Sequence, residues 1–263
     1  MKSEGSTIYG LTGYPLGHSY SKAFFTEKFR EEGLRAEYLN FPLEALDREA
    51  IVKLIEETPE LRGLNVTAPH KRRAYALADR RTPEAEACGA ANTLRFRRGE
   101  SDNARDLIIE AHNTDIEGFR EAIRPYLGVA GQRKALICGT GGAAEAVRVA
   151  LEKEGIKCIF VSRHPERHSN AIGYDSVKNC IGPKDVIVNA TPLGTYPDTN
   201  SCPPLPYEAL GSGNLCADLV YNPAETLFMK RCASQGATTF NGRAMLEKQA
   251  LASYKFWNQS SKV

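Results

Sequence analysis

The sequence contains no apolar run long enough for a membrane-spanning helix, and residues 1–15 carry no signal-peptide pattern. Its seven cysteines are odd in number and scattered, without a C-x-x-C pair, so we expect reduced thiols and no metal site. The formal net charge is only +2 over 263 residues, which argues against a broad surface for nucleic acid or membrane. Together these absences favour a cytoplasmic protein whose partners are neither nucleic acids nor membranes.

The chain does have an ordinary globular composition, with 42% hydrophobic and 25% charged residues, and enough length for two domains. Strand-like and helix-like segments alternate along it, which predicts an α/β fold with parallel sheets. We expect strands at 7–12, 37–41, 64–67, 91–96, 107–112, 134–138, 157–161, 185–190, 215–220 and 237–240, the fourth and fifth forming a hairpin. We expect helices at 20–32, 43–57, 70–79, 115–127, 143–153, 223–235 and 244–256.

A glycine-rich turn, Gly139-Thr-Gly-Gly-Ala-Ala144, links the strand at 134–138 to the helix at 143–153. With the strand at 157–161 it completes a βαβ unit, in which small residues let the backbone approach a pyrophosphate at a helix N-terminus. The alternative is a turn that binds nothing, but the order of strand, turn, helix and strand favours a dinucleotide site. Its predicted contacts are Gly139, Thr140, Gly141, Gly142 and Ala143.

The residues after the second strand of this unit indicate which dinucleotide is bound. NAD-binding units usually place an Asp or Glu at the end of that strand, to bond the ribose 2′-hydroxyl. Here Ser162, Arg163, His164 and Arg167 stand there, and arginine is suited to the 2′-phosphate of NADP. A solvated polar turn is the alternative reading, and Glu166 leaves NAD open. NADP is the prediction.

Three polar motifs upstream of residue 116 are harder to explain as packing. Ser19 and Ser21 stand at a strand-to-helix junction, Asn65, Thr67 and Lys71 follow a strand, and Asn113-Thr-Asp115 precedes the second half of the chain. Taken singly, the serines and Asp115 could cap helices and Lys71 could be a surface lysine. Because each motif follows a predicted strand or a domain junction, where α/β proteins bind ligands, we expect a substrate site.

With these motifs in place, the sequence resembles the shikimate dehydrogenase family. Eight blocks carry the resemblance in the family's order: Gly17-His-Ser-Tyr-Ser21, Asn65-Val-Thr-Ala-Pro-His-Lys71, Gly89-Ala-Ala-Asn-Thr93, Asn113-Thr-Asp115, Gly139-Thr-Gly-Gly-Ala-Ala144, Asn189-Ala-Thr-Pro-Leu-Gly194, Asp218-Leu-Val-Tyr-Asn-Pro223 and Gly242-Arg-Ala-Met-Leu-Glu-Lys-Gln249. The chain departs from the family pattern at several positions, among them Lys22, Ala111 and Ser162. The change at Ser162 bears on cofactor preference, although both arginines are retained.

The resemblance implies a two-domain α/β enzyme with a cleft between the domains. The substrate-binding domain would comprise residues 1–114 and 242–263, and a Rossmann-type doubly wound domain at 115–241 would bind NADP. The family reduces 3-dehydroshikimate to shikimate with NADPH, on the route to chorismate and aromatic amino acids. The implied catalytic pair is Lys71 and Asp115. The implied substrate contacts are Ser19, Ser21, Asn65, Thr67, Asn92, Tyr221 and Gln249. The implied cofactor contacts add Ser162, Arg163, Arg167, Asn189, Thr191 and Gly242 to the glycine turn.

The chemistry of this reaction suits those residue types. Hydride addition to the ketone carbon creates an alkoxide that needs a proton; Lys71 can donate it, and Asp115 can orient the lysine and favour its charged form. Two alternatives stay open. One is an enzyme that uses NAD and prefers quinate or accepts both quinate and shikimate, and the other is a catalytically silent NADP-binding regulatory protein. The chain is expected to act as a monomer or homodimer.

Overall fold

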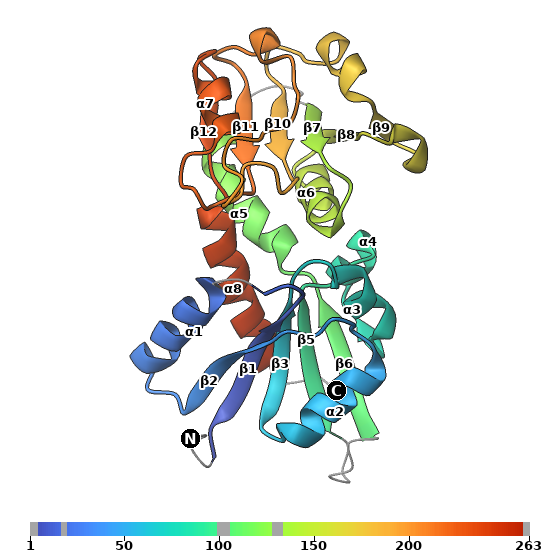
Figure 1. Cartoon of the computed structure of the whole chain (residues 1–263), viewed down its shortest axis with the longest axis vertical. Helices are drawn as coiled ribbons and strands as arrows, with labels where there is room; N and C mark the ends of the chain where they lie inside the picture. The colour runs from blue at the N-terminus through green and yellow to red at the C-terminus, as the bar shows by residue number, and fades with distance from the viewer. Residues whose placement is uncertain (1–4, 17–19, 99–105, 128–133, 260–263) are drawn as a thin grey trace. The chain divides into compact units, whose positions relative to one another are not determined.

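The computed structural model describes residues 5–16, 20–98, 106–127 and 134–259. The chain forms two compact units, one made of residues 1–114 and 250–263 and the other of residues 115–249. Each unit contains one six-stranded sheet, so the predicted α/β fold class is confirmed (Figure 1). Within the described ranges, no helix combines the length and apolar character needed to cross a bilayer.

The first unit is a mixed sheet with the strand order β2-β1-β3-β5-β6-β4. Its strands are β1 (Thr7–Thr12), β2 (Ala36–Phe41), β3 (Leu61–Val66), β4 (Arg80–Arg81), β5 (Thr93–Arg98) and β6 (Leu107–His112). Only β5 runs against the others, because β5 and β6 form the predicted antiparallel hairpin. The start of β5 therefore lies at the same edge as the carboxyl ends of β3 and β6.

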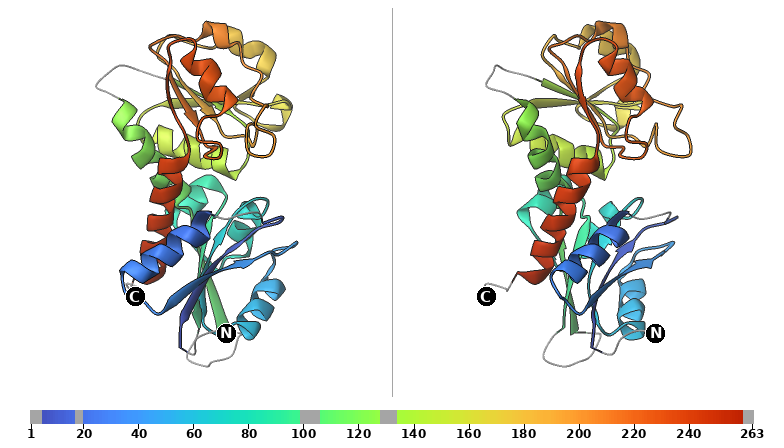
Figure 2. Two further views of the ribbon diagram at one scale, coloured as in Figure 1. Left: turned by 60° about the vertical axis from the view of Figure 1, so that its left-hand side comes forward. Right: turned by 90° about the vertical axis from the view of Figure 1, so that its left-hand side faces the viewer.

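Helices cover both faces of this sheet (Figure 2). The helices α2 (Arg48–Glu57) and α3 (Lys71–Leu77) pack on one face with Ile8, Leu64 and Leu94. The opposite face carries α1 (Tyr20–Glu31) and the last turns of α8 (Arg243–Asn258), with an aromatic cluster. In that cluster the Trp257 ring stacks on Tyr9 at a centroid distance of 4.6 Å. Alternating side chains of β1 enter opposite cores, as the strand period requires.

The docking of Trp257 depends on a glycine in the facing strand. A Cβ at Gly63 would lie 2.4 Å from Trp257 Nε1, and that same nitrogen donates to the carbonyl of Leu94 at 2.9 Å. Gly63 in β3 therefore leaves room for the indole to reach its hydrogen-bond acceptor. The contact of Trp257 with Gly63 and Leu94 thus anchors the end of α8 on the sheet, and no pattern of neighbouring residues in the sequence predicts it.

Gly63→Ala should lower the free energy of unfolding by about 1–3 kcal/mol, because the added methyl overpacks the contact with Trp257. Urea unfolding followed by tryptophan fluorescence measures this change at the affected residue itself, since Trp257 is the chain's one tryptophan. Gly211→Ala is the matched control, because a Cβ there meets nothing within 4 Å. Equal stabilities of the two variants would contradict the proposed fit.

The second unit is a parallel sheet with the strand order β12-β11-β10-β7-β8-β9. Its strands are β7 (Lys134–Cys138), β8 (Lys157–Val161), β9 (Ala171–Ile172), β10 (Val186–Asn189), β11 (Leu215–Asp218) and β12 (Thr238–Phe240). Numbered within the unit, this order is 3-2-1-4-5-6, the doubly wound arrangement of dinucleotide-binding domains. The order reverses between β7 and β10, which is where such sheets bind ligands.

The helices of this unit include α5 (Asp115–Leu127), α6 (Gly142–Glu152) and α7 (Leu227–Ala233). The helices α5 and α6 pack against each other, and α7 packs on β11 and β12. A cluster with three buried cysteines, Cys138, Cys216 and Cys232, fills the face under α7. The seven cysteines, all within the described residues, form no disulfide.

Several predicted boundaries differ from those observed. The helix expected at 43–57 begins only at Arg48, because the Asp47 side chain caps it by accepting from the Ala50 N–H. The helix expected at 223–235 is α7, which begins after the cap residue Thr226. The short helix α4 (Pro83–Cys88) was not anticipated, although Thr82 and Pro83 form a standard N-terminal signal. The chain returns to the first unit at residue 250 by its contacts, eight residues after the expected boundary at 242.

Candidate functional site

The carboxyl edge of the first sheet brings together residues from motifs far apart in the sequence. Asn65 of β3 is in register with Thr93 of β5, which in turn pairs with His112 of β6. The Asn65 and Asn92 motifs are also joined by their backbones, since the Val66 N–H donates to the Asn92 carbonyl at 2.8 Å. The motifs that the sequence separates by some 25 residues are therefore adjacent at one edge.

Lys71 opens α3 at this edge. Its carbonyl oxygen accepts from the Ala91 N–H at 2.8 Å, which places the start of the helix beside Asn92. Thr67 lies one turn before it and is held to β1 by donating its N–H to the Thr12 carbonyl at 2.9 Å. Lys71 and Thr67 are both half-buried. The structure thus groups three predicted residues, Thr67, Lys71 and Asn92, within the first unit.

The amide group of Asn92 is held at both ends by one residue. The Thr114 N–H donates to Asn92 Oδ1 at 2.8 Å, and Asn92 Nδ2 donates to Thr114 Oγ1 at 2.9 Å. Asn113, next to Thr114, donates from its Nδ2 to the Ala90 carbonyl at 3.0 Å. All three side chains are buried. This two-point contact fixes the plane of the Asn92 amide.

The side-chain amide of Asn65, by contrast, already forms hydrogen bonds with other side chains of the protein. Asn65 is only 5% exposed, its Oδ1 accepts from the Tyr38 hydroxyl at 2.8 Å, and its Nδ2 donates to Ser253 Oγ at 2.8 Å. The sequence offered Asn65 as a direct substrate contact, whereas these bonds suit a supporting role. Ser21, in the first turn of α1, is buried, while Ser19 and the neighbouring His18 lie outside the described residues.

The predicted catalytic residue Asp115 and the remaining predicted substrate residues belong to the second unit. Asp115 begins α5 and is 5% exposed, and Tyr221, just after β11, is 37% exposed. Gln249 lies on α8 against α5, where a Cβ at Gly118 would meet Gln249 Cβ at 2.9 Å and the Met245 carbonyl at 2.8 Å. The lack of a side chain at Gly118 therefore permits the close crossing of these two helices.

The glycine turn has the geometry expected of a phosphate-binding turn. Gly139 has a φ of +101°, and a Cβ there would lie 3.2 Å from the Ala190 carbonyl and 3.2 Å from Thr191 Cγ2. The turn is thereby packed against the end of β10, at the point where the strand order reverses. Gly141 caps α6, and a Cβ there would meet nothing within 4 Å, so the N-terminus of an 11-residue helix is open to an anion. Thr140, Gly142 and Ala143 complete this turn and are half-buried.

Asn189 and Asp218 form a buried pair beneath the turn. Asn189 Oδ1 accepts from Thr191 Oγ1 at 2.6 Å, and its Nδ2 donates to Asp218 Oδ1 at 2.9 Å. Asp218 also accepts from Thr226 Oγ1 at 2.6 Å. Asn189 is fully buried, so it shapes the loop that carries Thr191. Gly242 is required nearby for a different reason, since a Cβ would lie 2.1 Å from the Leu219 carbonyl.

Burial raises the pKa of Asp218 to about 6, against hydrogen bonds from Thr226, Val220 and Asn189 that act in the opposite direction. Because the ordinary value is 3.8, the folded state binds the extra proton between about pH 4 and pH 6. Protonation of Asp218 therefore contributes its full amount to the free energy of unfolding below about pH 4. This contribution is lost as the pH rises through about 6.

Asp218→Asn should remove this pH dependence, since an amide does not titrate and can donate to Thr226. Between pH 4 and pH 7 the variant should gain on the order of 2–3 kcal/mol in unfolding free energy relative to the wild type. Urea unfolding at a series of pH values measures the difference. Asp175→Asn, at an exposed carboxyl of the same unit, is the control and should follow the wild-type profile. Parallel profiles for wild type and Asp218→Asn would refute the assignment.

The basic turn after β8 lies at the carboxyl end of that strand. Ser162 Oγ accepts from the His164 N–H at 3.0 Å, which holds the turn in shape. Arg163 and Arg167 are exposed, and Glu166 lies 3.7 Å from Arg167 Nε and 3.5 Å from His164 Nδ1. Glu166 thus contacts other residues of the turn, and the guanidinium groups of Arg163 and Arg167 are both exposed at the strand end.

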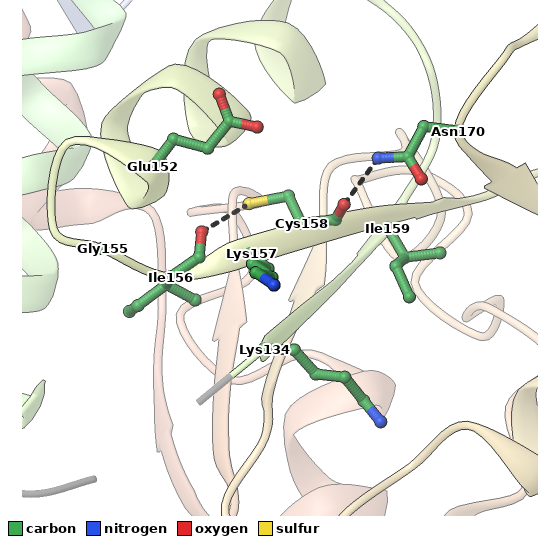
Figure 3. Close-up of a pocket in the computed structure, with 8 residues that line it drawn as sticks. All are labelled: Lys134, Glu152, Gly155, Ile156, Lys157, Cys158, Ile159 and Asn170. Carbon is green, nitrogen blue, oxygen red and sulfur yellow. Dashed lines mark hydrogen bonds between the residues drawn. The ribbon is translucent and has the colours of Figure 1, made fainter. Parts of the chain in front are cut away.

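A cavity of about 540 Å³ opens at the other end of β8 (Figure 3). Its lining includes Lys134, Lys157 and Asn170, and the amide of Asn170 bonds the Cys158 carbonyl at 2.7 Å. The cavity lies at the amino end of the strand, whereas doubly wound sheets bind nucleotides at the carboxyl ends. It therefore takes no part in the site described above.

Comparison with known proteins gives consistent results. Residues 11–94 match a family model described as the shikimate dehydrogenase substrate binding domain. The chain is 34% identical to the shikimate dehydrogenase (NADP(+)) of Methanopyrus kandleri, over 96% of this chain and 90% of that protein. It is 31% identical to that of Desulforamulus reducens, over 95% and 89%.

Solved structures agree with the sequence relatives. A shikimate dehydrogenase in complex with NADP+ superposes with a TM-score of 0.83 at 28% identity, covering 98% of this chain and 92% of that one. The Thermus thermophilus enzyme in complex with NADP(H) and shikimate gives a TM-score of 0.78 at 30% identity, covering 95% and 93%.

Proposed function

This chain belongs to the shikimate dehydrogenase family, and on that premise we propose that it interconverts 3-dehydroshikimate and shikimate with NADP(H). The observation that carries the proposal is the grouping of Thr67, Lys71 and Asn92 at one sheet edge, beside the clamp on the Asn92 amide. The activity makes the protein an oxidoreductase acting on an alcohol, in aromatic amino acid biosynthesis.

We propose that the first unit supplies most of the substrate contacts. Shikimate carries one carboxylate and several hydroxyls, so its site needs many neutral hydrogen-bonding groups at fixed positions. Ser19, Ser21 and Tyr221 are assigned to the carboxylate, and Thr67, Asn92 and Gln249 to the ring hydroxyls. Asn65 is reassigned from a direct contact to a positioning residue, because both ends of its amide already bond protein groups.

Lys71 is the proposed general acid and base. As an ammonium it donates a proton to the substrate oxygen when the ketone is reduced, and as an amine it accepts that proton in the reverse direction. The carboxylate of Asp115 is the proposed partner, which favours the charged form of the lysine and orients it. The second unit fits the cofactor, because the absence of a side chain at Gly141 leaves open space at the N-terminus of α6.

In this proposal NADP, when bound, supplies or accepts the hydride, and residues of the second unit hold the cofactor in position. The glycine turn would hold the pyrophosphate through backbone N–H groups, with Thr191 beside it and Gly242 permitting the nearby backbone contact with Leu219. Ser162, Arg163 and Arg167 would receive the 2′-phosphate.

Steady-state kinetics with shikimate or quinate, each with NADP+ or NAD+, test the proposal. The shikimate and NADP+ combination should give the highest kcat/KM. A maximum for quinate with NAD+ would assign the chain to the quinate-preferring alternative. Absence of turnover with all four combinations, together with NADP+ binding, would favour a regulatory protein.

We further propose a cytoplasmic location, which the seven free thiols support. We also propose that residues 1–114 and 242–263 form the substrate-binding domain and residues 115–241 the NADP-binding domain. The division of the chain into two compact units supports this assignment, although their boundary lies at residue 250. A monomer or homodimer is the expected oligomeric state. Sedimentation equilibrium would measure a molar mass equal to that of one chain or of two.

A further inference from the structure

A chain of hydrogen-bonded side chains runs through the interior of the first unit. It begins at Tyr38 in β2, whose phenol interacts with the side chain of Ser21 in α1. Tyr38 donates to Asn65 Oδ1 at 2.8 Å, and Asn65 Nδ2 donates to Ser253 Oγ in α8 at 2.8 Å. From Ser253 it continues to Thr93 and Thr114.

Ser253 is the branch point of this chain. Its Oγ lies 2.8 Å from Asn65 Nδ2, 2.9 Å from Thr93 Oγ1 and 3.2 Å from Thr114 Oγ1. Ser253 is fully buried, so no water competes for these three contacts. Thr114 is the residue that holds both ends of the Asn92 amide. The hydroxyl of Ser253 thus supports the group that fixes Asn92.

The two ends of the chain are assigned substrate contacts, Ser21 and Asn92. The members between them are buried, and Tyr38 is held further by stacking on Phe25 at 4.6 Å. Burial raises the pKa of the Tyr38 phenol, against the bond from Ser21. The phenol therefore stays protonated and keeps its hydrogen for Asn65. A single buried network sets the orientation of two groups that approach the substrate from different elements.

We propose that Tyr38, Asn65 and Ser253 are positioning residues for shikimate, acting through Ser21 and Asn92 without touching the substrate. This inference rests on the proposed function and deepens it, since it names what fixes the substrate contacts. Ser253 lies four residues after Gln249 and four before Trp257, so these three share one side of α8. Ser253 itself is assigned no role in the chemical step.

Tyr38→Phe and Ser253→Ala test the inference, because each removes one hydroxyl and little volume. Each should raise the KM for shikimate about 2- to 12-fold, the change that one net hydrogen bond produces. The KM for NADP+ should not change, and kcat should fall less than the KM rises. The double variant should show less than the product of the single effects, because both act through one network.

Tyr207→Phe is the matched control. The Tyr207 hydroxyl is buried in the second unit and donates to the Pro203 carbonyl at 2.8 Å, so its loss removes one buried bond of the same kind. It should lower the melting temperature as the test variants do and leave the KM for shikimate unchanged. Thr93→Ser, which keeps a hydroxyl, should retain the wild-type KM, while Thr93→Val should raise it.

The outcomes separate the inference from the proposed function. If the wild type oxidises shikimate and both test variants match Tyr207→Phe in KM, the network has no positioning role and the inference falls alone. If the wild type does not oxidise shikimate, the proposed function falls and the inference falls with it. Should Ser253→Ala not fold, Tyr38→Phe with its KM measurement decides the question.

Discussion

Lys71→Ala should lower kcat for shikimate oxidation by about 10²–10⁴-fold and change the KM by less than about threefold. The reason is that the lysine handles the proton of the reacting hydroxyl, whose charge changes in the transition state, while neutral groups hold the rest of the ring. Steady-state kinetics at saturating NADP+ measure both constants. Lys71 begins α3 with its side chain half-buried, and its main-chain bond to Ala91 does not depend on the side chain. The variant should therefore fold.

Two further variants sharpen this test. Lys71→Arg keeps the positive charge but stays protonated at neutral pH and cannot accept the proton of shikimate, so it should be nearly as inactive as Lys71→Ala if proton transfer matters. Recovery of most of the activity by Lys71→Arg would show that the charge alone suffices. Arg73→Ala, an exposed cation two residues further along the same helix, is the control and should keep wild-type kinetics. Full shikimate oxidation by Lys71→Ala would overturn the mechanism.

Replacing both Arg163 and Arg167 with alanine should reduce the preference for NADP+ over NAD+ by about 10²-fold. A charge-assisted bond to phosphate contributes about 1.5–3 kcal/mol, and the exposure of both arginines places each at the lower end. The ratio of kcat/KM for the two cofactors measures the effect. Most of it should appear as a higher KM for NADP+, because NAD+ has no 2′-phosphate to lose.

Ionic strength gives an independent check on the same assignment. Since the guanidinium groups are exposed, the wild-type preference should fall as salt is raised, and the double variant should show little further change. Lys178→Ala removes an exposed cation elsewhere in the second unit and is the control. An unchanged cofactor ratio in the double variant would exclude the turn after β8 as the 2′-phosphate site.

The partners of Asn65 and Asn189 could not be predicted from the sequence. The sequence marked Asn65 and Asn189 as polar residues at strand ends, and both lie there. Their side chains, however, bond Tyr38, Ser253 and Asp218. Both asparagines are now assigned to supporting roles. A motif records which residue types occur together, but it does not record which partner each polar atom finds.

Local patterns in the sequence alone determined most of the order of strands and helices, the βαβ unit with its glycine turn, and the chemical types at the sheet edges. These follow from alternation, periodicity and backbone requirements within a few residues. Tertiary structure decided the rest, because its contacts join distant positions: Ser253 meets Asn65 across 188 residues of sequence, and Trp257 reaches Leu94 across 163. Such pairings depend on how strands order in a sheet and where a helix returns to it, so only the folded chain shows which buried groups hold the substrate residues in place.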